Sequence, residues 1–415
     1  MKNNIINELT WRGLVKQITN QEKIISAQNN HDFVYCGFDP TADSLHVGHL
    51  MMIVTLKRFG LAGFQPIALI GGATGMIGDP SFKSAERVLQ TDEQVDKNIK
   101  AISKQLQKII PNVTFVNNAD WLKSISLIDF LRDVGKHFNI SYLLAKESIA
   151  TRIQTGLSVT EFSYTMLQAY DFYHLYTNNN CTVQIGGSDQ WGNITSGIDF
   201  IADKIGRDNS KASGFTIPLL TKSDGKKFGK TESGAVWLDA NKTSEYDFYQ
   251  FWFNQADEDC EKMLKFLTFL TEQEINDLIE NHKQEPHKRV MQKALATEIT
   301  KFVHGQEGLE KAIKLTDAFF KGDLFSLTDD LLKMAIVSLP SIELEKSTKI
   351  IDALVSVSAS SSKREAREFI NSKAIYVNGE LVVDENQLLS DFKTIEEKYL
   401  LIKRGKRKYF SVILK

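Results

Sequence analysis

The chain has 415 residues, of which 42% are hydrophobic and 25% charged, and its formal net charge is −2. This length and composition are ordinary for a soluble globular protein of two or three domains, and its cysteine usage fits a reducing cytosol. The near-neutral charge excludes the overall positive field of many nucleic-acid binders, so any RNA contact must come from local patches. Three widely spaced cysteines predict free thiols. No apolar run approaches the roughly 18 residues that a membrane-spanning helix needs.

The first strong pattern predicts a strand, a tight loop and a helix. Apolar residues 33–38 predict a buried strand, Asp39-Pro40-Thr41 breaks it, and Ser44 is a good N-cap for the apolar helix that follows. The start of this helix carries His46-Val47-Gly48-His49. A helix N-terminus suits a phosphate, and Gly48 leaves room for a base or ribose. Taken alone, the four residues fit equally well two surface histidines beside a packing glycine.

Two glycine-rich segments follow further apolar runs. Residues 71–80 come after the run 67–70, and residues 186–193 come after the run 181–185. In open α/β sheets, ligands bind beyond the carboxyl ends of the strands. The alternation of strand-like and helical patterns up to about Pro218 therefore predicts a parallel sheet with one ligand site at these strand ends.

A polar loop follows at residues 219–231, with two glycines and four lysines. Lysine is a flexible point charge that can follow a phosphate as negative charge builds on it, and such stabilisation is often the largest catalytic contribution. The alternative is a solvated basic turn. The loop becomes a stronger candidate because it follows the polar segment 186–193.

The remainder of the chain predicts a helical region and a separate basic module. Aromatic residues within 244–323 have helical spacing, which indicates core packing more than base stacking. After a linker around 338–341, residues 361–370 predict a capped basic helix, and Asn378-Gly379 predicts the turn of a hairpin over 375–382. Phosphate contacts are predicted from Lys363, Arg364, Arg367, Lys403, Arg404, Lys406 and Arg407. The alternative is a solvated charged face.

Together these motifs resemble the bacterial-type tyrosyl-tRNA synthetases, a family of class I aminoacyl-tRNA synthetases. Residues 35–50 match the family pattern Tyr-Cys-Gly-Phe-Asp-Pro-Thr-Ala-Asp-Ser-Leu-His-x-Gly-His-Leu, and residues 161–172 and 186–193 match further blocks. Residues 227–231 match the mobile signature loop, and the C-terminal module resembles the S4 RNA-binding fold. Lys373 departs from the pattern, because the family usually has glycine there. If that position has a positive φ, lysine costs about 1 kcal/mol.

The resemblance implies an α/β fold class with a definite division of the chain. Residues 1–220 would form a Rossmann-like catalytic domain with a parallel sheet, and residues 221–243 the mobile signature loop. A helical tRNA-binding domain on the anticodon side would span 244–325. A linker over 326–346 and a small α+β S4-like domain over 347–415 would follow. Boundaries inferred in this way hold to within several residues.

The implied reaction joins tyrosine to tRNA(Tyr) in two steps. Tyrosine and ATP form tyrosyl-adenylate and pyrophosphate, and the tyrosyl group then passes to the 3′-terminal adenosine of tRNA. Because the carboxylate of tyrosine is already ionised at pH 7, no protein nucleophile is needed, and positioning and charge stabilisation dominate. Mg²⁺ should accompany ATP without a prosthetic group or a protein cage for the metal. The family is homodimeric. The apolar segment 138–155 would suit a dimer interface or an internal contact equally well.

The resemblance also assigns roles to single residues. The implied catalytic residues are Thr41, His46, His49, Lys227, Lys230 and Thr231, with added charge from Lys83 and Arg87. The implied tyrosine-binding residues are Tyr35, Asp79, Tyr164, Gln168, Asp171 and Gln190. The implied ATP-binding residues are Cys36, Gly37, Asp39, His46, Gly48, His49, Gly187, Asp189, Lys227 and Lys230. Tyr35 and Asp171 would read the phenol hydroxyl. Buried polar groups left unpaired by phenylalanine reject it without an editing site, a principle for which tyrosyl-tRNA synthetase is itself a standard example.

Two other hypotheses remain open at this stage. One is another nucleotidyltransferase with a His-x-Gly-His helix, which would need neither the pair of Tyr35 and Asp171 nor an S4-like tail. The other is a catalytically silent RNA-binding protein, which should have lost a signature histidine or lysine. Both signatures are intact in this chain.

Overall fold

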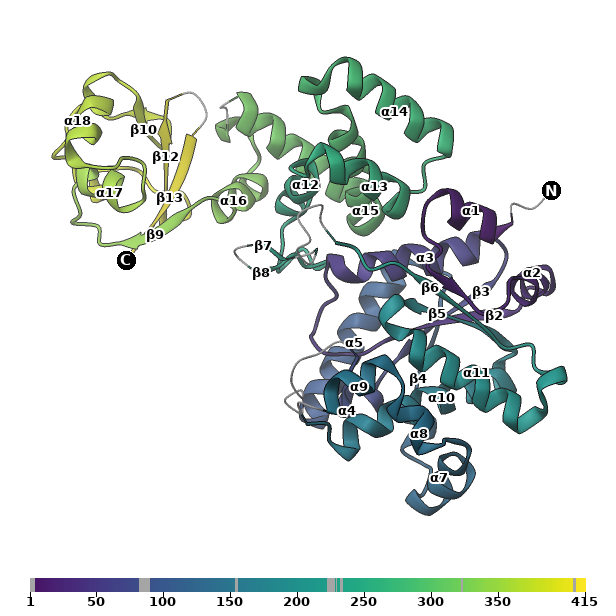
Figure 1. The fold of residues 1–415 in the computed structure, drawn as a ribbon. Coiled ribbons are helices and arrows are strands. Elements are labelled where there is room, and N and C mark those ends of the chain that lie inside the picture. The colour runs from purple at the N-terminus through teal and green to yellow at the C-terminus, as the bar shows by residue number, and fades with distance from the viewer. Residues whose placement is uncertain are drawn as a thin grey trace. The chain divides into compact units, whose positions relative to one another are not determined.

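The structure is a computed structural model, and it describes residues 4–81, 90–153, 156–221, 228, 230–231, 234–321, 324–405 and 408–415. The chain forms two compact units (Figure 1). The first unit comprises Met1–Asp239 and Asn254–Ile299, and the second comprises Ala240–Phe253 and Thr300–Lys415. Among the described helices, none has both the length and the apolar character that a membrane crossing requires.

The first unit is built around a six-stranded sheet with the order β1-β6-β5-β2-β3-β4. Its strands are β1 (Gln17–Ile18), β2 (Phe33–Phe38), β3 (Gln65–Ile70), β4 (Thr114–Asn117), β5 (Cys181–Gly187) and β6 (Ser213–Ile217). All neighbours pair in parallel except the short edge strand β1. The chain runs outward from β2 to β4 on one side and from β5 to β6 on the other. The strand order therefore reverses between β2 and β5, which is where open α/β sheets bind ligands. The predicted parallel sheet is confirmed.

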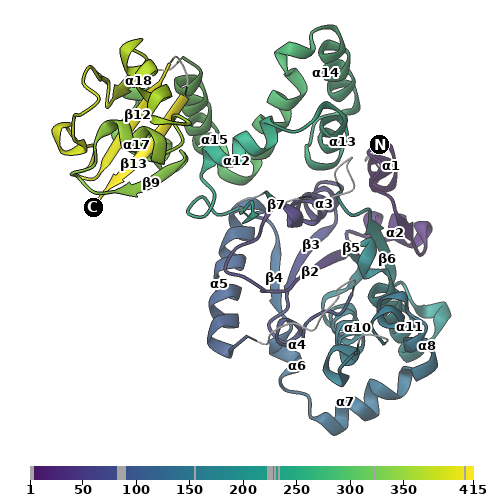
Figure 2. The same cartoon turned by 60° about the vertical axis from the view of Figure 1, so that its left-hand side comes forward.

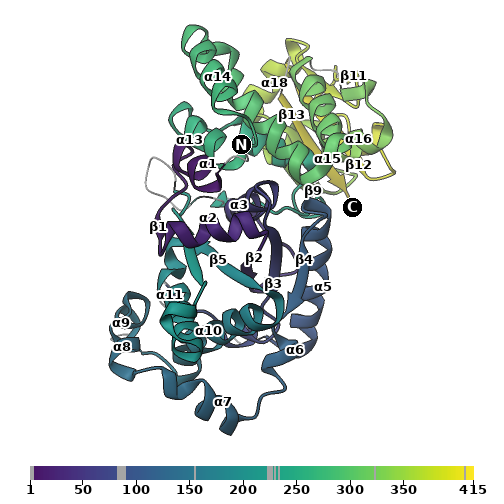
Figure 3. The ribbon, with the colours of Figure 1, turned by 90° about the vertical axis from the view of Figure 1, so that its right-hand side faces the viewer.

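Helices cover both faces of this sheet (Figures 1 and 3). α3 (Leu50–Leu61) lies on one face, and α10 (Val159–Asn179) and α11 (Trp191–Ile205) lie on the other. The long helix α5 (Asp92–Ile109) lies beside the β4 edge (Figure 2). The remaining helices of this unit are α1 (Ile5–Trp11), α2 (Gln21–Asn30), α4 (Thr74–Ile77), α6 (Ala119–Leu122), α7 (Leu127–Asp133), α8 (Ile140–Leu144), α9 (Glu147–Ile153), α13 (Asp257–Leu267) and α14 (Glu272–Gln284).

The start of α3 differs from the sequence prediction. Ser44 was the expected N-cap, but a 3₁₀ turn over Val47–His49 precedes α3, and His46 caps that turn. The Ser44 hydroxyl instead donates to the Leu45 carbonyl at 2.8 Å. The tertiary contacts of the loop before the helix therefore override the local capping preference of serine.

The second unit combines helices with a separate five-stranded sheet of order β11-β10-β12-β13-β9. Its strands are β9 (Ser341–Leu344), β10 (Ile375–Val377), β11 (Glu380–Leu381), β12 (Tyr399–Arg404) and β13 (Lys408–Leu414). Its helices are α12 (Glu245–Phe253), α16 (Asp329–Val337), α17 (Ile350–Ser356) and α18 (Lys363–Asn371), with the later part of α15 (Val290–Lys321). α15 contains a break at Gly305, whose φ is 79°. The predicted α+β module is confirmed, and the domain boundaries stay predictions.

The hairpin of the second unit forms as predicted, with β10 and β11 joined at Asn378-Gly379. α18 ends just before it, and Lys373 follows with a φ of 57°. This left-handed conformation is the one that would favour glycine at this position. Position 373 therefore has the positive φ at which lysine is expected to cost stability relative to glycine.

Candidate active site

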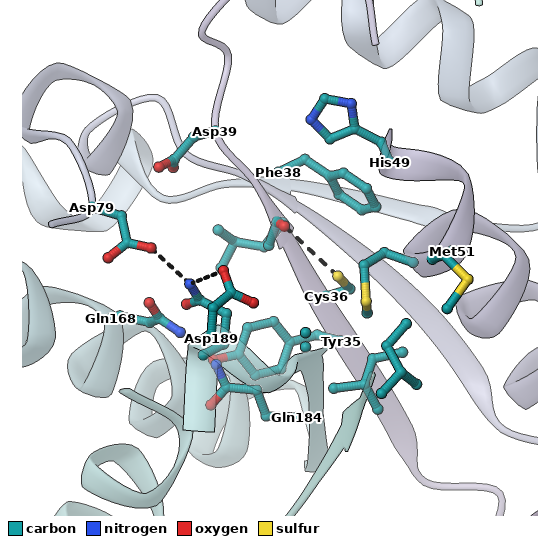
Figure 4. Close-up of a pocket in the computed structure, with 18 of the residues that line it drawn as sticks. Tyr35, Cys36, Phe38, Asp39, His49, Met51, Asp79, Gln168, Gln184 and Asp189 are labelled. Carbon is teal, nitrogen blue, oxygen red and sulfur yellow. Dashed lines mark hydrogen bonds between the residues drawn. The ribbon is translucent and has the colours of Figure 1, made fainter. Parts of the chain in front are cut away.

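A cavity of about 300 Å³ opens at the carboxyl ends of β2, β5 and β6, at the point where the strand order reverses (Figure 4). Most of the predicted site residues line it: Tyr35, Cys36, Gly37, Asp39, Thr41, Gly48, His49, Asp79, Tyr164, Gln168, Asp171, Gly187, Asp189 and Gln190. The structure thus brings together residues from positions 35 to 190 of the chain. His46 caps the turn Val47–His49, whose residues Gly48 and His49 line the pocket.

The deep end of the pocket holds polar groups that are buried. Tyr35 on β2 and Asp171 on α10 are each 1% exposed. Within the described residues, the Tyr35 hydroxyl and Gln184 Oε1 have no hydrogen-bond partner, although both atoms are buried. Burying a polar atom without a partner costs free energy. This end of the pocket is therefore suited to a ligand that brings a hydroxyl group.

Asp171 is held by two side chains that the sequence analysis missed. Its carboxylate accepts hydrogen bonds from Asn118 Nδ2 at 2.9 Å and from the Trp121 indole at 2.8 Å. Burial raises the pKa of Asp171 to about 7, and these two donors act in the opposite direction. Asn118 and Trp121 follow β4, so they belong to a further strand end with polar residues, the kind of sequence signal that identified the other parts of the pocket. Nothing in the sequence alone linked that strand end to α10.

Three carboxylates, Asp39, Asp79 and Asp189, line the pocket (Figure 4). Asp39 accepts from the Tyr164 hydroxyl at 3.0 Å and from the Thr74 hydroxyl at 3.1 Å. Burial and the nearby Asp39 raise the pKa of Tyr164 well above its ordinary value, so its hydroxyl stays protonated. Asp79 accepts from the amide of Gln190 at 2.7 Å. Such an arrangement favours a cationic group of a ligand.

His46 and His49 form a compact unit at the rim. The His46 backbone N–H donates to His49 Nδ1 at 3.2 Å, and His46 Nδ1 accepts from the Gly48 N–H at 3.0 Å. A Cβ on residue 48 would lie 2.7 Å from the His46 ring, so a side chain at this position would force the ring to shift. Burial and the nearby His46 lower the pKa of His49 to about 3, so His49 is neutral at pH 7. This neutral ring can form hydrogen bonds but does not supply positive charge.

The signature loop is described only in part. Lys230 and Thr231 form the short strand β7, which pairs with β8 (Gly234–Ala235), and their side chains are not described. Lys227, Lys83 and Arg87 lie outside the described residues. The segment 236–238, which follows the signature loop, forms backbone hydrogen bonds with residues next to His46. The Val47 N–H donates to the Val236 carbonyl at 2.9 Å, and the Leu238 N–H donates to the Leu45 carbonyl at 2.8 Å.

The basic side chains of the second unit have several partners within the chain. Three of them form ion pairs: Lys363 with Asp352 (2.5 Å), Arg364 with Glu368 (3.3 Å) and Arg367 with Glu385 (2.7 Å). Arg404 donates to the Ala359 carbonyl and lies over the Phe410 ring, and Lys403 lies over the Tyr409 ring. Lys406 and Arg407 lie outside the described residues.

The described residues do not supply a protein cage for a metal ion. Within them, no three His, Cys, Asp or Glu side chains are grouped closely enough to bind one. Mg²⁺ often binds mainly through substrate phosphates and water. The residues around the pocket are compatible with a metal that arrives on a phosphate ligand.

Comparisons with known proteins agree along the whole chain. A family model described as tRNA synthetases class I (W and Y) matches residues 27–321, and a model described as Tyrosine–tRNA ligase SYY-like C-terminal domain matches residues 331–412. Tyrosine–tRNA ligase of Mycoplasma capricolum is 72% identical over 415 residues, which are the whole of both chains. Tyrosine–tRNA ligase of Staphylococcus haemolyticus is 53% identical over 419 residues, which cover 99% of both.

A solved structure gives the same picture. The crystal structure of a C-terminally truncated Aspergillus nidulans mitochondrial tyrosyl-tRNA synthetase is 29% identical with a TM-score of 0.70. The match covers 77% of this chain and 94% of that one. The relatives found by sequence extend the similarity to the C-terminal module.

Proposed function

We propose how the pocket works in this chain, which belongs to the class I tRNA synthetases of the tryptophan and tyrosine type. The activity is that of a tyrosine–tRNA ligase, as in relatives that are 53% to 72% identical over nearly the full length. Tyrosine is activated with ATP and then transferred to tRNA. The roles of single residues below are proposals.

The assignment of Tyr35 and Asp171 to the phenol of tyrosine is supported mainly by the buried polar groups at the deep end of the pocket. The Tyr35 hydroxyl is buried without a partner among the described groups, and the buried Asp171 carboxylate is oriented by Asn118 and Trp121. A tyrosine phenol placed between Tyr35 and Asp171 would complete the hydrogen bonds of both groups. Phenylalanine would leave them unpaired, and this is a large penalty in a buried site.

The ammonium end of the tyrosine substrate is proposed to lie near the carboxylates of the pocket. We assign the α-ammonium group of tyrosine to Asp79, Tyr164 and Gln168, with Gln190 orienting the carboxylate end. We add Asp39 to this region, because the Tyr164 hydroxyl donates to it at 3.0 Å. Asp39 therefore orients Tyr164 as well as facing the ATP side of the pocket. A positioned ammonium holds the attacking carboxylate in place, which lowers the barrier by proximity and orientation.

ATP occupies the side of the pocket near the two histidines. Thr41 and His46 contact its terminal phosphate, Cys36 and His49 its ribose side, and Asp189 a ribose hydroxyl. Gly37, Gly48 and Gly187 leave room for the nucleotide at the same strand ends. His49 is neutral at pH 7, which fits a hydrogen bond to a ribose better than an ion pair with phosphate. Burial raises the pKa of Cys36 to about 12, so it remains a thiol.

The chemistry needs charge on the leaving group. The tyrosine carboxylate attacks the α-phosphorus of ATP, the bond to the bridging oxygen breaks, and pyrophosphate leaves with the negative charge. Lys227 and Lys230, with Thr231, close over that pyrophosphate, and Lys83 and Arg87 add charge. Mg²⁺ enters as part of the ATP substrate. A hydroxyl of the terminal ribose of tRNA then attacks the adenylate carbonyl, and AMP leaves.

The basic residues of the second unit are proposed to contact tRNA phosphates. They are Lys363, Arg364, Arg367, Lys403, Arg404, Lys406 and Arg407. Lys363, Arg364 and Arg367 form ion pairs but are themselves exposed, so these pairs are weak and phosphates can replace the carboxylates. Contacts of this kind supply affinity without base identity. A cytoplasmic location follows as an expectation, because tRNA is charged where proteins are made.

We also propose that the first unit forms a homodimer through an exposed apolar face. Leu127 and Ile128 on α7 are 72% and 69% exposed, Ile140 on α8 is 66% exposed, and Val159 at the start of α10 is 85% exposed. Large apolar side chains exposed on α7, α8 and the start of α10 favour an interaction surface in this part of the unit. The face extends the segment 138–155 to both sides along the chain. A second copy of the chain is the natural occupant in a symmetric assembly.

Tyrosine-dependent exchange of radiolabelled pyrophosphate into ATP tests the function. We expect exchange in the presence of tyrosine and far weaker exchange in the presence of phenylalanine or tryptophan. No exchange with tyrosine, or better exchange with tryptophan, would contradict the proposal. Aminoacylation of tRNA measured in parallel separates the second step from the first.

A further inference from the structure

The loop that connects β2 to the histidine motif is held by side-chain amides of α5. This ATP loop, defined as residues 39–46, carries Thr41 and His46. Asn98 Nδ2 donates to the Pro40 carbonyl at 2.9 Å, and the amide of Gln105 accepts from the Leu45 N–H at 2.8 Å. The two α5 residues are seven positions apart, so they lie on the same side of the helix.

Asn98 is the unusual member of this set. It is 0% exposed and lies between the buried apolar residues Val95 and Ile102 of α5. A helix stripe of this kind normally carries apolar residues, and a buried amide is costly unless it is hydrogen bonded. Both functional atoms of Asn98 are used. Oδ1 accepts from Gln94 at 2.8 Å, and Nδ2 also donates to Gln90 Oε1 at 3.2 Å.

Asn98 is connected through Gln90 to Thr41, which is proposed to contact the terminal phosphate of ATP. Gln90, which Asn98 holds by its Oε1, donates through Nε2 to the Thr41 carbonyl at 2.9 Å. Gln105 also donates to the Ser44 hydroxyl at 3.1 Å. Backbone or hydroxyl groups at positions 40, 41, 44 and 45 are thus bound by one row of amides. These hydrogen bonds involve only neutral groups, so the amides do not compete with the phosphates of ATP for positively charged side chains.

The opposite side of the ATP loop is held by the chain that follows the signature loop. The Leu45 carbonyl accepts from the Leu238 N–H at 2.8 Å, and residue 46 pairs with Trp237 in an antiparallel bridge. The ATP loop is therefore fixed between α5 and the segment 236–238. Its position is set by neighbours that do not line the pocket.

We propose that Asn98 and Gln105 are positioning residues for ATP, which place Thr41 and His46 at the terminal phosphate. The inference rests on the proposed contacts of Thr41 and His46 with ATP. Positioning matters because a misplacement of about 1 Å at a reacting group can lower a rate on the order of 100-fold. Neither α5 residue is among those that line the pocket, so each acts through the loop.

The test compares amide-removing variants in the full-length enzyme. Asn98→Leu keeps the approximate volume and removes all three hydrogen bonds. Asn98→Asp keeps the shape but loses the donations to Pro40 and Gln90. Gln105→Met removes the hydrogen bonds with the Leu45 N–H and the Ser44 hydroxyl. Gln107→Met is the matched control, because Gln107 is an exposed amide on the same helix that donates to Pro111 instead of the ATP loop.

Pyrophosphate exchange with varied ATP and with varied tyrosine gives the readout, together with equilibrium binding of tyrosine. We expect kcat/KM for ATP to fall roughly 10- to 100-fold in Asn98→Leu and less in Gln105→Met. Tyrosine affinity should stay within about twofold of the wild type, and Gln107→Met should leave all values unchanged. Equal losses for ATP and tyrosine in Asn98→Leu would overturn the positioning role in favour of a general structural one. So would unchanged ATP use in both Asn98→Asp and Gln105→Met.

Two further variants separate this inference from the site assignment. If Thr41→Ala and His46→Ala leave ATP use unchanged, the proposed ATP contacts are wrong. If those variants impair ATP use while the α5 variants do not, the ATP contacts stand and the positioning role is wrong. Asn98→Asp and Gln105→Met keep the test decisive if Asn98→Leu does not fold.

Discussion

Replacing Asp171 with asparagine should remove a loss of stability that the free enzyme undergoes as pH rises from 5 to 8, while lowering its tyrosine-dependent activity. Asp171 is 1% exposed, and burial raises its pKa from 3.8 to about 7. The native carboxyl therefore keeps its proton up to about pH 7, whereas the unfolded chain releases it near pH 3.8. Between these two values the unfolded state is favoured progressively as pH rises, so the free energy of unfolding falls.

The size of this effect follows from the difference of about three pKa units. Each unit corresponds to about 1.4 kcal/mol, so the ionised carboxylate costs the native state up to about 4 kcal/mol above pH 7. From pH 5 to pH 8 the expected loss is about 2 to 3 kcal/mol. An asparagine side chain does not ionise, and this part of the pH dependence should be absent in Asp171→Asn. The carboxylate is retained for its function, as in other sites where activity and stability conflict.

Urea unfolding at pH 5 and pH 8 measures the difference. The same comparison for Asp120→Asn, an exposed carboxylate on the neighbouring α6, is the control for a change of charge alone. Tyrosine-dependent pyrophosphate exchange should fall at least tenfold in Asp171→Asn. If the wild type and Asp171→Asn lose the same free energy of unfolding between pH 5 and pH 8, the reasoning from burial is refuted.

Four other changes test separate parts of the molecule. Lys373→Gly should raise the free energy of unfolding by about 0.5 to 1 kcal/mol in urea, because glycine adopts the φ of 57° without strain; a loss would mean that the lysine side chain contributes more than its backbone costs. Tyr35→Phe should reduce the preference for tyrosine over phenylalanine in pyrophosphate exchange by at least tenfold, and an unchanged ratio would remove Tyr35 from phenol recognition. Lys230→Ala should slow adenylate formation in single-turnover kinetics far more than it weakens tyrosine binding, and equal losses would count against its role on pyrophosphate. Ile128→Glu should convert a dimer to a monomer in light scattering, whereas an unchanged mass would exclude the α7 face as the interface.

Local patterns in the sequence were sufficient for the elements that depend on neighbouring residues. The strand before Asp39 and the hairpin around Asn378-Gly379 form where the apolar run and the turn chemistry predict them. The expectation for Lys373 came from the family resemblance instead, because the family usually has glycine at this position. Its positive φ is the usual way to end a helix before such a turn.

Only the tertiary structure decided which distant groups meet. Trp121 donates to Asp171 across 50 positions, and Asn98 donates to Pro40 across 58. A single asparagine or tryptophan carries no sequence signal for such a partner. Ser44 has the side chain of an N-cap, but His46 caps the turn because the loop before α3 is bound on both sides. Hydrogen bonds within a few residues follow from the local chain, whereas those that position the pocket exist only after the sheet and its helices have assembled.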